Sequence, residues 1–364
     1  MTGTTASPTY GRSHIEQLLS LRRLSCADRF SNEHTLECPL WARGAYGGQL
    51  IAQSLLAAYE TVDGEFVAHS IHCHFLNAAN VELSVVFDVD RVRDGRSFTT
   101  RVIHARQNNK LILLATVSFT LDSTRGHILQ HSVPFPSDER LPDDKPEAAI
   151  QSAAGQGGQG QPCDCVRSTS VMKGIPSQRR YRQWVKARGK IQETSLDASS
   201  SPDGSSTRAK LSRRDNHHAH LAALAYMTDN YFLGTVFRAH DASRFSDRPY
   251  PIPTQTVQGD AADVKAWRSY FDRLADEEKS NNGVAPNNNK HVTMLASLDH
   301  TIFFHQSRGF RADEWLLNEV KTPWADDERG VVVGRIWNHE GILVATCIQE
   351  GVVRLAQLQG GSRL

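Results

Sequence analysis

The sequence predicts an α+β protein built from two similar units, in each of which an antiparallel sheet covers its own helix. The chain has 364 residues, more than a single hydrophobic core usually organises. Two segments, 67–121 and 297–355, resemble each other. An apolar stretch with helical spacing precedes each of them, at 47–61 and 217–233. These three observations favour a duplicated unit over a single large one.

The two segments keep the same register over most of their length. His69 matches His300 at an offset of 300 − 69 = 231, and Ala115 matches Ala345 at 345 − 115 = 230. Both segments alternate strands with polar turns, which we place at 94–95 and 108–109 in the first and at 326–330 and 338–341 in the second. Polar and apolar residues alternate along the strands, as in sheets with one covered face. The alternative is a chance likeness between two β meanders.

The remaining segments set the expected boundaries. We expect a disordered tail at 1–12, an N-terminal unit at 13–125 that opens with a short helix within 14–24, and a C-terminal unit at 178–358. Segment 126–177 is expected to be a linker with a Gln/Gly-rich loop, and the low-complexity stretches near 195–210 and 241–290 are expected to be insertions.

Composition excludes several classes of protein. The 41 basic and 40 acidic residues give a formal net charge of +1, so no nucleic-acid partner is expected. The longest apolar runs fall well short of the roughly 20 residues that span a bilayer, so no membrane span is expected. The six cysteines are expected to be free thiols of a reducing compartment; they are Cys26, Cys38, Cys73, Cys163, Cys165 and Cys347.

Two clusters could suggest a metal site, but neither has suitable spacing. Cys163 and Cys165 are separated by one residue, whereas zinc and redox motifs usually have two or more. His217, His218 and His220 cannot all lie on one helix face. We therefore expect no metal ion and no cofactor.

One acidic residue interrupts the second apolar helix. Asp229 lies four residues from Ala225 and three from Phe232, on the apolar face. A desolvated carboxylate has a raised pKa, which suits a group that takes a proton from water. The alternative is an Asp satisfied by backbone groups at an irregular helix end.

Three further positions could assist this carboxylate. Gln349 stands on an otherwise apolar strand where the offset of 231 puts Ser118 in the first unit, and Ser297 opens the second repeat. Both could hold a water molecule, although each could instead be a surface polar residue. The first helix opens with Gly47-Gly48-Gln49, where free amides could bind an oxyanion or a substrate carbonyl; a tight turn is the alternative.

The last three residues resemble a peroxisomal address. Ser362-Arg363-Leu364 differs from Ser-Lys-Leu only by an Arg that keeps the positive charge. The sequence therefore predicts binding to the peroxisomal import receptor and a peroxisomal matrix location, with chance as the alternative.

Four ordered motifs resemble the bacterial thioesterase II and peroxisomal acyl-CoA thioesterase family. They begin at Arg43, His69, Ser297 and Gln349 and read RGAYGGQ, HSIHCHFL, SLDHTIFFH and QEGVVR. The resemblance covers about 13–122, 178–240 and 292–355, and the long stretches near 195–207 and 241–290 depart from the family pattern.

The resemblance implies a tandem hotdog fold and hydrolysis of fatty acyl-CoA without a covalent intermediate. It assigns the catalytic Asp, hydroxyl residue and amide to Asp229, Ser297 and Gln349, and it implies a homo-oligomer. Two alternatives stay open at this point. One is an acyl-CoA-binding protein without turnover, and the other is an enoyl-CoA hydratase that uses Asp299 and His300.

Overall fold

The computed structural model describes residues 12–25, 28–38, 44–122, 129–142, 162–168, 174–192, 216–230, 232–244, 272, 275 and 290–356. Residues 1–11 of the expected tail at 1–12, most of both insertions and the C-terminal tripeptide lie outside these residues. All further statements concern the described part of the chain.

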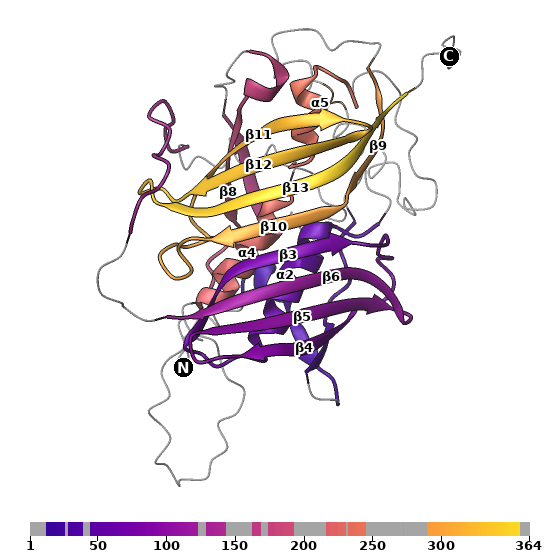
Figure 1. Cartoon of the computed structure of the whole chain (residues 1–364), viewed down its shortest axis with the longest axis vertical. Helices are drawn as coiled ribbons and strands as arrows, with labels where there is room; N and C mark the ends of the chain where they lie inside the picture. The colour runs from indigo at the N-terminus through magenta and orange to yellow at the C-terminus, as the bar shows by residue number, and fades with distance from the viewer. Residues whose placement is uncertain are drawn as a thin grey trace, which may run out of the picture.

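A single antiparallel sheet runs through both halves of the protein (Figure 1). The strand order is β1-β2-β4-β5-β6-β3-β10-β13-β12-β11-β8-β7, with β9 paired to β13. The N-terminal half contributes β1 (Leu21–Arg23), β2 (Arg29–Asn32), β3 (Phe66–Phe75), β4 (Val86–Asp94), β5 (Phe98–Gln107) and β6 (Lys110–Leu121). The C-terminal half contributes β7 (Cys163–Arg167), β8 (Tyr181–Ala187), β9 (Val292–Ser297), β10 (Asp299–Phe304), β11 (Leu316–Asp326), β12 (Arg329–Trp337) and β13 (Leu343–Leu355).

The two halves join at the antiparallel pair β3–β10, where Ile71 lies opposite Ile302. These two residues are also repeats of each other, because 302 − 71 = 231. A residue that faces its own repeat across an antiparallel ladder marks a local twofold axis. The predicted duplication is therefore a twofold arrangement of two sheet halves.

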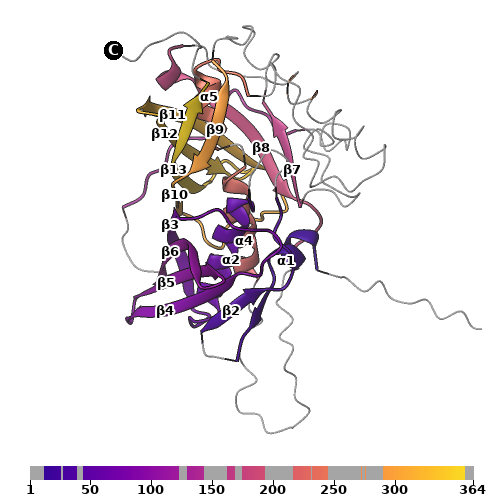
Figure 2. The same ribbon diagram turned by 90° about the vertical axis from the view of Figure 1, so that its right-hand side faces the viewer.

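The long helices α2 (Gly47–Tyr59) and α4 (His217–Thr228) lie together on one face of the sheet (Figure 2). Nine of the twelve residues of α4 are buried, because the helix has the sheet on one side and α2 on another. The predicted α+β architecture, with each half of the sheet covering a helix, is confirmed, and it is the tandem hotdog arrangement.

Smaller helical elements complete the description: α1 (His14–Leu19), α5 (Gly234–Ala239) and a 3-10 turn, η2 (Pro176–Gln178). Two helix predictions need correction. The helix expected within 14–24 ends at Leu19, since Leu21–Arg23 pair with β2. The helix expected over 217–233 ends at Thr228, and Asp229 is its C-cap.

The strand predictions agree with the structure in detail. Inward residues alternate along β5 and β6. Asn108 and Asn109 have φ of 46° and 62°, and Asp327 and Glu328 have φ of 49° and 57°, so two of the four predicted polar turns, 108–109 and 326–330, reverse the chain with left-handed residues. One expectation was wrong: the segment 126–177 contributes β7, which pairs with β8, so the C-terminal half begins before residue 178.

The five described cysteines are free. Cys163 and Cys165 are both buried at β7, and burial raises the pKa of the Cys163 thiol far above its usual range. A thiol in this state is a poor nucleophile. His220 lies apart from His217 and His218, since its Nδ1 accepts the Ala312 N–H at 3.1 Å.

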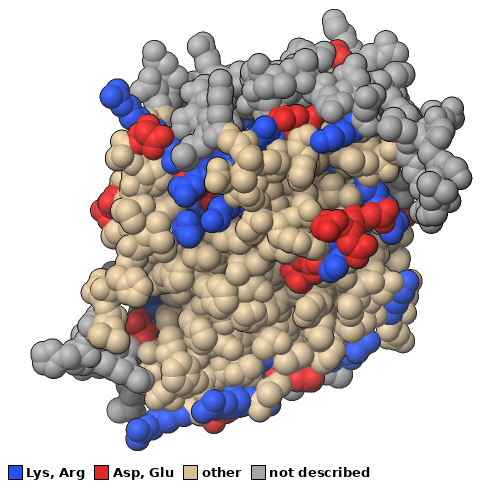
Figure 3. Space-filling view, turned by 45° about the horizontal axis from the view of Figure 1, so that its top comes forward, with Lys and Arg blue, Asp and Glu red and all other residues tan. Residues whose placement is uncertain are grey.

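No helix of the described part is both long enough and apolar enough to span a membrane. Figure 3 shows a face on which acidic and basic side chains form separate small groups around a broad uncharged area. That distribution agrees with the near-zero net charge.

Candidate active site

The three polar residues singled out above meet at one point. The Gln349 amide nitrogen donates to Asp229 Oδ1 at 2.9 Å and to Ser297 Oγ at 2.9 Å. They come from three elements: Asp229 ends α4, Ser297 ends β9, and Gln349 lies on β13. The Gln349 side chain thus joins Asp229, which lies 120 positions away in the sequence, to Ser297, which lies 52 positions away.

Gln349 is fully buried, and both hydrogens of its amide nitrogen are used. Its carbonyl oxygen, Oε1, is buried and accepts no hydrogen bond from the described residues. A buried acceptor without a partner costs about 1–3 kcal/mol. This oxygen therefore favours a small donor such as water beside the carboxylate.

Burial raises the pKa of Asp229 to about 6, although the hydrogen bond from Gln349 and the backbone amide of Gly48 both act to lower it. A carboxylate of this pKa is ionised at neutral pH and is a stronger base than an exposed Asp. The structure thus provides the perturbed carboxylate that the apolar helix predicted.

The glycine pair lies where α2 meets the end of α4. A Cβ on Gly47 would stand 2.8 Å from Asp229 Oδ2, and a Cβ on Gly48 would stand 2.4 Å from the Tyr226 carbonyl oxygen. The Tyr46 hydroxyl donates to that same carbonyl at 2.8 Å. The glycines let the first turn of α2 approach the Asp229 carboxylate this closely.

Gln49 points to other groups. Its Oε1 accepts the Glu37 N–H at 2.8 Å, and its Nε2 donates to the Leu18 carbonyl at 3.4 Å. Both contacts are to backbone, and the side chain is fully buried. In this structure Gln49 therefore anchors the N-terminal segment to α2; its expected contact with substrate stays a prediction.

Two residues that sequence reasoning connected with a hydratase hold the three site residues in place. His300 is fully buried, and its Nε2 lies 2.9 Å from Thr228 Oγ1. The Thr228 hydroxyl donates to the Ala225 carbonyl at 2.8 Å. Its only hydrogen is therefore committed, so His300 Nε2 must carry the proton and donate to Thr228.

Asp299 has a similar supporting role on the other side of β10. Its Oδ1 accepts the Glu350 N–H at 2.8 Å, next to Gln349. The segment 297–300 thus contains Ser297 itself, fixes Gln349 through Asp299 and fixes Asp229 through His300 and Thr228. We name the four residues of segment 297–300 the β10 clamp.

The clamp does not form an acid–base pair. Asp299 and His300 are neighbours on a strand and point to opposite faces, and burial lowers the pKa of His300 to about 3. A neutral, buried imidazole that donates to Thr228 is not available to a substrate β-carbon. One indication of this role was visible in the sequence, since the first repeat also has a His, His69, at the matching position.

One detail of the repeat alignment was wrong. Cys347 pairs with Ile302, and Val117 pairs with Ile71, so the last strands correspond at 347 − 117 = 230. The counterpart of Gln349 is therefore Phe119 rather than Ser118. Phe119 is fully buried, as Gln349 is, whereas Ser118 lies on the other side of the strand.

Comparisons with known proteins identify the family of the chain. Residues 38–120 match the family model of the acyl-CoA thioesterase N-terminal domain, and residues 137–353 match that of the C-terminal domain. The chain is 29% identical over 339 residues to acyl-coenzyme A thioesterase 8 of Mus musculus, covering 88% of this chain and 83% of that protein. It is 25% identical to the peroxisomal acyl-coenzyme A thioester hydrolase 1 of Saccharomyces cerevisiae, covering 94% of both.

Solved structures show the same arrangement. The acyl-CoA thioesterase II TesB2 of Mycobacterium marinum superposes with a TM-score of 0.59 and 25% identity, covering 96% of this chain and 99% of that one. The tesB protein of Mycobacterium avium subs paratuberculosis superposes at 0.53 with 20% identity, over 93% and 98% of the two chains. At 20% identity, this second likeness shows that the two proteins share a fold and nothing more.

Proposed function

Because the chain belongs to the acyl-CoA thioesterase family and is a thioester hydrolase of acyl-CoA, we propose that Asp229, Ser297 and Gln349 hold and activate the attacking water. The observation that carries the proposal is the Gln349 amide, which bridges the other two side chains at 2.9 Å each. Its unpaired Oε1 and the raised pKa of Asp229 supply an acceptor for water and a base.

The reaction follows from these positions. Asp229 takes a proton from the water, and the oxygen adds to the thioester carbonyl carbon. The negative charge that develops on the carbonyl oxygen is stabilised by the backbone amide of Gly47 at the start of α2, since the amides of Tyr46, Gly48 and Gln49 already have partners. The carbon–sulfur bond then breaks, the fatty acid is released, and the proton held by Asp229 passes to the departing CoA thiolate.

The test is release of free thiol from palmitoyl-CoA by the wild type and by Asp229→Asn. We expect at least a roughly hundredfold loss of kcat in the variant, since a positioned general base contributes about 10²–10⁴-fold. The control is Asp88→Asn, which removes an Asp that pairs with Arg29 on the sheet and should keep kcat within about twofold.

Two outcomes would contradict this proposal. If the wild type binds a thioether analogue but releases no thiol from short, medium or long acyl-CoA, the chain is a binding protein without turnover. If Asp229→Asn releases thiol at the wild-type rate, a group other than Asp229 activates the water.

We also propose that the enzyme acts in the peroxisomal matrix and reaches it through the import receptor. Ser362-Arg363-Leu364 supplies the small, basic and aliphatic residues of the address, and a yeast relative carries the word peroxisomal in its name. A fluorescent protein fused to the N-terminus should accumulate in peroxisomes with the full chain and remain diffuse when these three residues are removed. Punctate fluorescence in both cases would contradict the role of the tripeptide.

A homo-oligomer is proposed as well. Phe303 and Ile348 are each 37% exposed on the outer side of the sheet, near the joint of the two halves. Apolar residues gathered at the centre of an uncovered sheet favour association. Light scattering coupled to size exclusion would give one chain mass if the protein is a monomer, which would refute this expectation.

A further inference from the structure

One aromatic residue of the N-terminal half lies directly beside the three polar site residues. Phe75 ends β3, and its backbone N–H donates to the Leu298 carbonyl at 2.9 Å. Leu298 follows Ser297 in the chain, so this bond places the end of β3 next to the proposed hydroxyl. The side chain of Phe75 is half-buried and packs against the main core. Phe75 therefore belongs to the surroundings of the site, although the reaction written for Asp229 gives it no role.

The ring of Phe75 faces the first glycine of α2. A Cβ on Gly47 would stand 3.0 Å from both Cε1 and Cζ of this ring and 2.8 Å from Asp229 Oδ2. Gly47 thus lies between the edge of the ring and the carboxylate. Its backbone amide is the donor proposed for the oxyanion, so a thioester carbonyl that binds this amide enters the same narrow space. The edge of the ring is then a wall that the thioester touches.

The ring also covers the carboxylate from the side of β3. Burial is the largest cause of the raised pKa of Asp229, and the amides of Gln349 and Gly48 act against it. An apolar ring adds to this burial, because it keeps water away and offers no hydrogen-bond donor to the carboxylate. Alanine in place of Phe75 would leave a gap beside Asp229 that is large enough for water.

The other titratable groups that face Asp229 are uncharged at neutral pH. Cys73 lies on β3 two residues before Phe75, and burial, with a smaller contribution from the charge of Asp229, raises the pKa of its thiol far above its usual range. His300 on β10 reaches Asp229 only through Thr228, and burial lowers the pKa of its imidazole to about 3. From α2, β9 and β13 the carboxylate meets amides and a hydroxyl. The basicity of Asp229 thus depends on how well its apolar neighbours exclude water.

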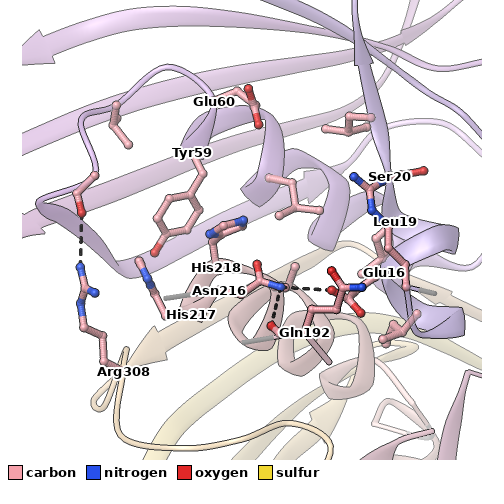
Figure 4. Close-up of a pocket in the computed structure, with 18 of the residues that line it drawn as sticks. Glu16, Leu19, Ser20, Tyr59, Glu60, Gln192, Asn216, His217, His218 and Arg308 are labelled. Atoms are coloured by element: carbon pink, nitrogen blue, oxygen red, sulfur yellow. Dashed lines mark hydrogen bonds between the residues drawn. The ribbon is translucent and has the colours of Figure 1, made fainter. Parts of the chain in front are cut away.

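The opposite end of β3 has a phenylalanine in a contrasting position. Phe66 begins the strand, is also half-buried and packs against the same core. It lines a cavity of about 500 Å³ whose wall includes Tyr59 and Glu60 (Figure 4). Glu60 is the C-cap of α2, as Asp229 is of α4, but the Glu60 side chain is exposed. The two ends of β3 therefore carry a matched pair of phenylalanines, one beside a buried carboxylate and one beside a cavity with an exposed carboxylate.

We propose that the Phe75 ring is the solvent-excluding wall of the active site, which covers the Asp229 carboxylate and holds the thioester carbonyl of acyl-CoA against the Gly47 amide. The inference rests on the proposed function, since it takes the base and the oxyanion donor from that reaction. The N-terminal half then supplies an apolar wall besides its glycines. This wall sets the strength of a base that the C-terminal half carries.

The test is the pH dependence of kcat for palmitoyl-CoA in Phe75→Ala. In the wild type, kcat should rise with a midpoint near the pKa of Asp229, about 6. Water admitted by the smaller side chain should lower this midpoint by at least about one unit, toward the value of about 3.9 for an exposed Asp. The ratio of kcat at pH 5 to kcat at pH 8 should then rise about fivefold, because more of the carboxylate is ionised at the lower pH. At pH 8, kcat itself should fall about 10- to 100-fold, since the base is weaker and the thioester is held less firmly.

Two further variants show whether the effect is local. Phe75→Leu restores an apolar side chain, so its midpoint should lie within about half a unit of the wild type and most of kcat should return. Phe66→Ala removes the same ring from the same core at the other end of β3, so it should lower the Tm by a similar amount and leave the midpoint unchanged. If Phe75→Ala does not fold, Phe75→Val, whose branched side chain favours a strand, replaces it with the same expected direction of shift.

The midpoint decides the outcome. A folded Phe75→Ala or Phe75→Val enzyme with the wild-type midpoint would overturn the wall even if kcat falls, because lost packing alone lowers kcat without changing the pKa of the base. A shift of equal size in Phe66→Ala would overturn it too. Asp229→Asn separates this failure from a failure of the proposed function. Thiol release that Asp229→Asn abolishes, together with an unmoved midpoint in Phe75→Ala, refutes the wall alone, whereas thiol release at the wild-type rate in Asp229→Asn refutes both proposals.

Discussion

Within the β10 clamp, His300 touches no reacting atom and is expected to position Asp229 through Thr228. Its Nε2 donates to Thr228, and Thr228 precedes Asp229 in the chain. His300→Phe keeps a ring of similar size but removes the donor. We expect the end of α4 to shift and kcat to fall.

The size of the effect follows from the bond that is lost. Leaving a buried polar group unpaired costs about 1–3 kcal/mol. If this cost appears entirely in the transition state, it corresponds to about a 5- to 150-fold loss of kcat, and misplacing a catalytic group by about 1 Å costs about 100-fold. The KM for palmitoyl-CoA should change by less than about threefold.

The assay is thiol release over a range of palmitoyl-CoA concentrations, with thermal unfolding as a check of the fold. His305→Phe is the matched control, because His305 Nε2 lies at the same 2.9 Å from a threonine, Thr346, on the exposed side of the sheet. It should keep wild-type kcat. His300→Gln, whose Nε2 can reach Thr228, should recover part of the lost rate.

A double mutant decides whether His300 acts through Thr228. Thr228→Val removes the hydroxyl and keeps the shape, so Thr228→Val with His300→Phe should be no slower than the slower single variant by more than about twofold. Losses that multiply would show that the two residues act separately. A folded His300→Phe enzyme with wild-type kcat would refute the positioning role altogether.

Three other predictions concern the carboxylate and the glycines. Because Asp229 must be ionised and its pKa is raised to about 6, kcat should rise with pH through about 6; Gln349→Leu removes a donor that lowers this pKa, so the rise in its residual activity should move to higher pH. The pKa of Asp229 is higher in the folded than in the unfolded chain, so ionisation of this carboxyl lowers the free energy of unfolding as pH rises from about 4 to 6. Asp229→Asn should therefore be more stable than the wild type at pH 7, by up to about 3 kcal/mol. Urea unfolding at pH 4 should show no such advantage. Gly48→Ala would put a Cβ 2.4 Å from the Tyr226 carbonyl, so it should lower the Tm by several degrees, whereas Gly47→Ala, with its Cβ 2.8 Å from Asp229 Oδ2, should lower kcat more than the Tm; equal effects of the two on kcat would contradict this reasoning.

Two of the three proposed site residues stood out in the sequence because each broke a clear pattern. Asp229 interrupts an apolar helix, and Gln349 interrupts an apolar strand, so burial of a polar group could be inferred without a structure. That the two meet depends on β13 lying over the end of α4, which no local pattern contains. The amide bridge from Gln349 to Ser297 could therefore be expected only from the resemblance.

Other features escaped sequence reasoning for identifiable reasons. The strand Cys163–Arg167 is short and follows a Gln/Gly-rich stretch, so composition indicated a linker. The counterpart of Gln349 was misplaced by one residue because the two repeats differ by one residue between their anchors, and a one-residue slip exchanges the faces of a strand. The role of His300 was hidden because its partner, Thr228, lies 72 positions away.

The site explains why a duplicated protein can keep unequal halves. The proposed base, hydroxyl and amide, Asp229, Ser297 and Gln349, all come from the C-terminal half, whereas the glycines that allow close approach, Gly47 and Gly48, come from the N-terminal half. The twofold axis places the first turn of one helix against the last turn of the other at both ends. A small first turn is needed only where a carboxylate must be buried, and α4 accordingly begins with His217 and His218 at the end where Glu60 stays in solvent. Because no carboxylate is buried at that end, the first turn of α4 is free of the constraint that Gly47 and Gly48 meet at the other end.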